Sequence, residues 1–130
     1  MEWSFDPRWE DAAERVRTEI RLALEAQQRA DVILRLDMIY AELVSNAIRH
    51  APGPIEIAIE CQNSGGDITL HVLDRGPGYR LNPHLPSDIF SECGRGLFII
   101  AQFADGFMVD ERHGGGSHAR IVLKRREALV

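Results

Sequence analysis

The chain has 130 residues, a length that fits one domain with a sizeable hydrophobic core. Its formal net charge of -5 argues against nucleic acid as a main partner, and its 45% hydrophobic content is typical of a globular protein. The longest apolar runs span a few residues, so we expect no membrane-spanning segment, and Glu2 and Asp6 interrupt the N-terminus where a signal peptide would be apolar. Cys61 and Cys93 are too few for a disulfide framework and favour free thiols in a reducing cytoplasm.

The N-terminal part predicts a short strand followed by a helix. Residues 3–5 alternate aromatic and polar side chains, as in a strand with one apolar side. Asp6 as the N-cap and Pro7 as the first helical residue predict a helix that runs to about residue 28. An edge strand with aromatic side chains invites pairing with a second copy, so a homodimer is an open alternative.

A second, longer helix carries the first candidate site. Asp31 can cap it, apolar residues recur at helical spacing, and residues 52–54 end it. Glu42, Asn46 and Arg49 stack on one face of this helix. These polar groups can be a solvated face, with Arg49 favoured by the helix dipole. They can also be a magnesium-phosphate site with a general base beside it.

The second half predicts a hairpin, a long loop, a third helix and two closing strands. Apolar residues alternate over residues 55–59 and again over residues 68–74, with a turn between them. A long loop follows, and a helix is expected from about residue 97 to residue 104. Residues 107–111 and 119–123 read as the closing strands. The sequence therefore predicts a single domain over residues 1–130, an α+β two-layer sandwich with helices on one face of a mixed, mostly antiparallel sheet.

Three glycine-rich segments follow the candidate helix in order. Asp74 ends a strand and precedes Gly76 and Gly78, so a carboxylate sits beside a backbone that can approach a flat ligand. Residues 94–96 read Gly-Arg-Gly before a helix, and such N–H groups suit a polyphosphate. Ser117 follows a glycine beside the last strand. Taken singly, each segment is more often an ordinary turn or helix entry.

The order of these segments is more specific than any one of them. Glu-x-x-x-Asn on a helix, then Asp-x-Gly-x-Gly, then Gly-x-Gly at a helix start, then Gly-Ser resembles the GHKL ATPase superfamily, which has the Bergerat ATP-binding fold. Within it, residues 42–51, 74–79 and 94–100 look most like the anti-sigma-factor serine kinases of the RsbW and SpoIIAB type. The resemblance covers essentially the whole chain.

The resemblance implies a role for each segment. Glu42 would be the catalytic general base, and Asn46 would coordinate Mg2+ that bridges the phosphates of ATP. Asp74 would read the adenine amino group, supported by Ser117, and residues 79–93 would form the ATP lid. The remaining candidate nucleotide contacts are Arg49, His50, Gly76, Gly78, Gly94, Arg95, Gly96 and Leu97.

Two features depart from the family pattern. Ser117 stands where the family more often has Thr, and it keeps the hydroxyl. Some members carry a lid arginine just before the second glycine segment, where this chain has Glu92 and Cys93. Arg95 or Arg80 would then have to supply that charge, which bears on turnover more than on ATP binding.

The resemblance implies an ATP-dependent serine/threonine protein kinase that sequesters a sigma factor and phosphorylates an anti-anti-sigma partner of the STAS type. One alternative is a histidine-kinase-like ATP-binding module, although residues 1–30 contain no phospho-acceptor histidine. Another alternative is a catalytically silent, nucleotide-gated binding switch, against which Glu42 argues because a pure binder needs no base. A DNA-linked or chaperone ATPase would need large transducer domains.

Overall fold

The structure, a computed structural model, has two layers, a sheet and a pair of helices. It describes residues 1–50, 53–62, 65–75, 100–112 and 114–125. The strands are β1 (Glu2–Phe5), β2 (Ile55–Cys61), β3 (Ile68–Asp74), β4 (Gly106–Glu111) and β5 (Ser117–Leu123). The helices are α1 (Ala12–Ala26) and α2 (Ala30–His50), and residues 100–103 are also helical.

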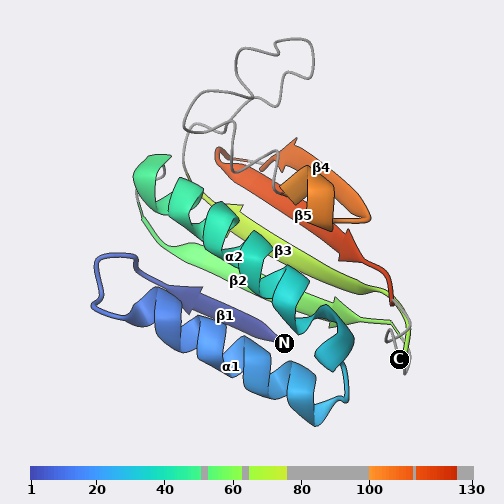
Figure 1. Cartoon of the computed structure of the whole chain (residues 1–130). Helices are drawn as coiled ribbons and strands as arrows, with labels where there is room; N and C mark the ends of the chain where they lie inside the picture. Colours follow the sequence, from blue (N-terminus) through green and yellow to red (C-terminus); the bar gives the residue numbers. More distant parts are fainter. Residues whose placement is uncertain (51–52, 63–64, 76–99, 113, 126–130) are drawn as a thin grey trace.

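The strands form one sheet in the order β1-β2-β3-β5-β4, and each described pair of neighbours is antiparallel. Figure 1 shows α1 and α2 side by side across one face of this sheet. The α+β two-layer sandwich predicted from the sequence is therefore confirmed. The strands predicted from residues 55, 68, 107 and 119 onwards all form, within one or two residues of the expected bounds.

Apolar periodicity builds the core between the two layers. Ile55, Ile57 and Ile59 of β2 point to the helices and are buried, because successive strand residues face opposite sides of a sheet. The buried apolar residues of α2 recur at helical spacing and are Val32, Leu36, Ile39, Tyr40, Leu43, Val44 and Ala47. No helix in the described part of the chain is both long enough and apolar enough to cross a membrane.

The first helix begins later than the sequence predicts. Asp6 and Pro7 were expected to start it, but α1 begins at Ala12. The Asp6 carboxylate instead accepts hydrogen bonds from the main-chain N–H and the guanidinium of Arg8. Asp11, with a φ of 60°, turns the chain before the helix starts. Local bonding by an aspartate side chain competes with helix capping, which explains the error.

Strand β1 lies at one edge of the sheet and pairs only with β2 in the described structure. Its two aromatic residues serve the protein's own core. Phe5 is 3% exposed, and Trp3 is partly buried against the core cluster. A homodimer through this strand would therefore use its main-chain edge, and it stays a prediction.

One end of the sheet gathers the ends of the described elements that carry predicted site residues. Only residues 51–54 separate the end of α2 from β2, so this helix end lies near the start of β2. Glu56 pairs with Leu73, and Asp74 pairs with Ser117, so β3 ends and β5 begins at that same end. Figure 1 shows the end of α2 on this side of the molecule.

Candidate functional site

Helix α2 places the predicted metal ligand in a protected position. Asn46 is 3% exposed, and its Oδ1 accepts a hydrogen bond of 2.8 Å from Nη2 of Arg49. Glu42 is half-buried one helical turn earlier, on the same face. The neighbouring Leu43 and Ala47 are buried in the core and fix the rotation of the helix. The structure thus brings the carboxylate, carboxamide and guanidinium to one face, as the sequence predicts.

Strand β3 ends in a buried carboxylate. Asp74 is 3% exposed, and its Oδ1 accepts a hydrogen bond of 3.3 Å from the main-chain N–H of Ser117. Ser117 is itself 2% exposed at the start of β5. Burying a carboxylate costs free energy unless it accepts hydrogen bonds. The bond from Ser117 therefore offsets part of the cost of burying Asp74. Ser117 thus contacts Asp74 through its main-chain amide, and its support of an adenine pocket stays a prediction.

Gly116 explains why a glycine precedes that serine. Its φ is 109°, and a Cβ on it would lie 2.1 Å from the main-chain oxygen of Asp74 and 2.9 Å from Cα of Arg75. No side chain fits in that space, and the φ itself disfavours other residues. The glycine therefore allows β5 to approach the end of β3 closely.

Arg112 also holds the end of β3, and the sequence gives no signal for it. Its Nη1 donates to the main-chain oxygen of Asp74 at 3.1 Å, and its Nη2 donates to Oε2 of Glu56 at 3.3 Å. In the sequence, Arg112 looks like an ordinary charged residue after a strand. Only the strand order reveals that it can reach the site.

Buried polar side chains occur at the site and elsewhere. Six polar or charged residues of the described chain are buried, and they are Arg29, Arg35, Asn46, His71, Asp74 and Ser117. The first two are bonded to the main chain of Gly66 and Lys124, and His71 is paired with His118. The other three are residues that the motif pattern predicts for a nucleotide site, and burying such polar groups costs free energy.

Several predicted site residues lie outside the described part of the chain. The side chain of His50 is among them, although α2 includes its main chain. So are the proposed lid at residues 79–93 and the arginines considered for phosphate charge, Arg80 and Arg95. The others are Gly76, Gly78, Gly94, Gly96 and Leu97.

The donor set fits a metal ion that arrives with phosphate. In the described residues, no group of three or more histidine, cysteine or acidic side chains is arranged to hold a metal. Mg2+ commonly takes only one or two protein oxygens and completes its shell with phosphate and water. The Oδ1 of Asn46 suits that role, and the Arg49 bond to it would have to give way.

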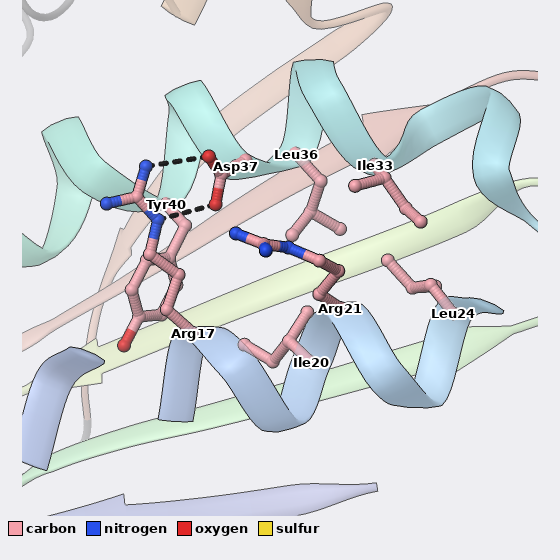
Figure 2. Close-up of a pocket in the computed structure, with 8 residues that line it drawn as sticks. All are labelled: Arg17, Ile20, Arg21, Leu24, Ile33, Leu36, Asp37 and Tyr40. Carbon is pink, nitrogen blue, oxygen red and sulfur yellow. Dashed lines mark hydrogen bonds and ion pairs between the residues drawn. The ribbon is translucent and has the colours of Figure 1, made fainter. Parts of the chain in front are cut away.

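A small pocket between the two helices is separate from this site. Figure 2 shows Arg17 of α1 facing Asp37 of α2, joined by hydrogen bonds of 2.5 and 2.7 Å. The Arg17 hydrogen bonds lower the pKa of Asp37 below its usual 3.8. Burial raises the pKa of Tyr40, whose hydroxyl donates to the main-chain oxygen of Ala13. These paired groups join the helices, so we read the pocket as structural.

The sheet face opposite the helices carries a histidine pair. Nδ1 of His71 and Nε2 of His118 are 2.7 Å apart, and Nε2 of His71 lies 2.9 Å from Oε1 of Glu60. Burial, followed by the positive charges nearby, lowers the pKa of His118. Asp110 and Arg120 form an ion pair of 2.8 Å on the same face. This side of the sheet thus carries paired polar side chains next to the exposed Met108.

Solved structures with the same architecture identify the class of fold. The catalytic domain of histidine kinase ThkA shares the fold with a TM-score of 0.56, at 15% sequence identity over 96% of this chain and 96% of that one. Histidine kinase AdeS of Acinetobacter baumannii gives a TM-score of 0.52, at 19% identity over 98% of this chain and 68% of that one. At these identities the likeness shows the fold alone, which is that of histidine kinase catalytic domains.

The sequence then identifies the family. Residues 6–123 match the family described as the histidine kinase-like ATPase domain, and the chain belongs to that family. Sensor protein IrlS of Burkholderia pseudomallei (strain K96243) is 31% identical over 126 residues, which cover 85% of this chain and 24% of IrlS. The chain therefore spans about a quarter of the length of that relative.

Proposed function

We propose that this protein binds ATP with Mg2+ at the end of the sheet and transfers the γ-phosphoryl group to a protein. The observation that carries the proposal is the buried Asp74 carboxylate, bonded to the amide of Ser117 at the end of the sheet near which α2 ends. A carboxylate held in this way can accept a hydrogen bond from the exocyclic amine of adenine. Family membership supports ATP as the nucleotide.

The residues of α2 would serve the phosphate end of the nucleotide. Asn46 would hold Mg2+ through Oδ1, and the bound ion supplies neutralisation of the phosphate charge. Arg49, released from Asn46, would be free to approach a phosphate oxygen. In transfer, the acceptor oxygen bonds to the γ-phosphorus while the β–γ bridging bond breaks and leaves ADP. Glu42 would take the acceptor's proton.

The acceptor is proposed from the motif resemblance. Residues 42–51, 74–79 and 94–100 favour a serine or threonine of a STAS-type anti-anti-sigma partner, with a sigma factor as the alternative binding partner. ATP binding would then choose between the two partners. Membership of the histidine kinase-like ATPase family favours a second candidate, a histidine on a partner or on another part of a longer protein.

Phosphotransfer assays distinguish these readings. The protein is incubated with Mg2+ and γ-labelled ATP, alone and with a STAS protein from the same genome, next to Asn46→Ala and Glu42→Ala. We expect ATP binding to weaken in Asn46→Ala, and label transfer to vanish in Glu42→Ala while ATP binding remains.

The stability of the labelled bond identifies the acceptor. A label that survives acid and is lost in alkali indicates phosphoserine or phosphothreonine, whereas the opposite behaviour indicates phosphohistidine. ATP binding without transfer to either kind of acceptor would favour the nucleotide-gated switch and contradict the kinase proposal. Absence of ATP binding would overturn the proposed site itself.

A further inference from the structure

Arg112 connects the end of the central strand to the opposite face of the sheet. We propose that it is a positioning residue for base recognition. It would hold the main chain of Asp74 so that the carboxylate is aimed at the adenine amine, and it would thereby set the preference for adenine over a base without that amine. This inference rests on the proposed ATP site and adds to it a residue that determines nucleotide specificity.

The first argument is the path of the side chain across the sheet. Arg112 directly follows β4, which is an edge strand, and β5 separates β4 from β3. Its guanidinium nevertheless reaches the main-chain oxygen of Asp74 on β3 and the carboxylate of Glu56 on β2. One side chain thus joins the outer strand β4 to the two strands beyond β5. Its side chain is 17% exposed, so water competes little for its bond to Asp74, whereas the Glu56 side chain is 41% exposed and that ion pair is weaker.

The second argument is that Asp74 is held from two sides. Its carboxylate belongs to the helix side of the sheet, with Val72 and Leu70, and Oδ1 meets the amide of Ser117. The guanidinium of Arg112 approaches from the opposite face of the sheet, where it also bonds to the Glu56 side chain. Movement of the main chain would shift the carboxylate, and Arg112 opposes that movement.

The third argument is the turn from which Arg112 projects. The main-chain N–H of Arg112 donates to the oxygen of Gly116 at 2.9 Å, and the N–H of Gly115 donates to the oxygen of Arg112 at 3.0 Å. Gly116 in turn lies against the main-chain oxygen of Asp74. The main chain of Arg112 is therefore held in place relative to the main-chain oxygen of Asp74. A charge-assisted hydrogen bond from a fixed donor positions its acceptor better than one from a mobile chain.

The test compares ATP with inosine triphosphate, whose base has a carbonyl oxygen in place of the amine. Both are titrated with Mg2+ into the parent, Arg112→Met, Arg112→Lys and Arg120→Met. Arg120 is a matched control, because it lies on the same sheet face and pairs with Asp110 away from Asp74. Thermal unfolding of each variant reports the general structural cost.

We expect the parent to prefer ATP and Arg112→Met to lower the ratio of the two affinities about ten-fold, the scale of one charge-assisted hydrogen bond. Arg112→Lys should recover part of the ratio, because an ammonium can still donate to the oxygen of Asp74. Arg120→Met should keep the parental ratio. Glu56→Ala, which removes one anchor of the guanidinium, should lower the ratio less, and it replaces Arg112→Met if that variant does not fold.

The outcomes separate this inference from the proposed function. Loss of both affinities by the same factor in Arg112→Met would mean a purely structural role and would overturn the inference. An unchanged ratio in Arg112→Met, or in Glu56→Ala when it stands in, would also overturn it while leaving the ATP site intact. A parent protein that binds no ATP would instead overturn the proposed function, and the inference with it.

Discussion

Asp74 and Ser117 lie opposite each other where β3 ends and β5 begins, and the amide of Ser117 donates to the Asp74 carboxylate. Both residues are almost fully buried. Strand pairing therefore presents an acceptor group at the end of the sheet, close to the end of α2.

Asp74→Asn should weaken ATP binding by about ten-fold or more. The asparagine has one accepting oxygen in place of two, and its hydrogen bond to the adenine amine is no longer strengthened by a negative charge. The asparagine can still accept from Ser117 through its oxygen, so we expect the fold to persist. Calorimetric titration measures the affinity, and circular dichroism checks the fold. Asp110→Asn, at an exposed ion pair on β4, is the matched control. Equal affinities in the parent and Asp74→Asn would contradict the assigned role.

Gly116→Ala should destabilise the protein by about 2–4 kcal/mol, because a positive φ and a backbone overlap act together. Its Cβ would meet the oxygen of Asp74, whereas a Cβ on Gly114 would meet nothing within 4 Å. Gly114 has a similar positive φ of 91°, so Gly114→Ala should cost only about 1 kcal/mol. Urea denaturation measures both. Equal losses in the two variants would show that the close approach to Asp74 contributes nothing.

Asp37→Asn should lower stability at neutral pH by about 1 kcal/mol, a value kept small because the ion pair is partly exposed. The pKa of Asp37 is lowered in the folded state by the hydrogen bonds of Arg17. The stabilisation is therefore complete above the unfolded pKa and is lost as the pH falls through the folded pKa. The difference between the parent and the variant should disappear in acid. A difference that persisted at the lowest pH would assign the effect to packing.

His118→Gln should flatten the dependence of stability on pH in the mildly acidic range. Burial, His71, Arg120 and Arg112 lower the pKa of His118, and Asp110 opposes them in part. The unfolded chain then protonates this imidazole more readily than the folded protein does. Stability is therefore highest above the unfolded pKa of about 6.5 and decreases as the pH falls below that value. Urea midpoints of the parent and the variant across this range give the two slopes. Identical slopes would remove His118 as the cause.

The sequence predicts the layers of this fold well because its signals are local. Alternation over β2 and β3 and the helical spacing within α2 depend on neighbouring residues alone, and the structure confirms them. The start of α1 is wrong for a reason that composition cannot show, namely that Asp6 bonds to Arg8 instead of capping the helix. Competition between two local hydrogen-bond patterns decides such a boundary.

Some residues of the candidate site can be predicted from the sequence, and others can be found only in the structure. The motif pattern points to Asn46, Asp74 and Ser117, and the structure buries all three. Arg112 could not be found in that way, because its contacts with Asp74 and Glu56 depend on the order of four strands. The contact between Arg49 and Asn46 also appears only in the structure, although their spacing on the helix allows it.

The measurement that tests the central claim most directly is a calorimetric titration of ATP into the parent and into Asn46→Ala, each with and without Mg2+. We predict that the parent binds ATP more tightly with Mg2+, and that Asn46→Ala loses most of this gain because it lacks the Oδ1 oxygen. No ATP binding by the parent, or an unchanged magnesium effect in Asn46→Ala, would contradict the assignment of this site.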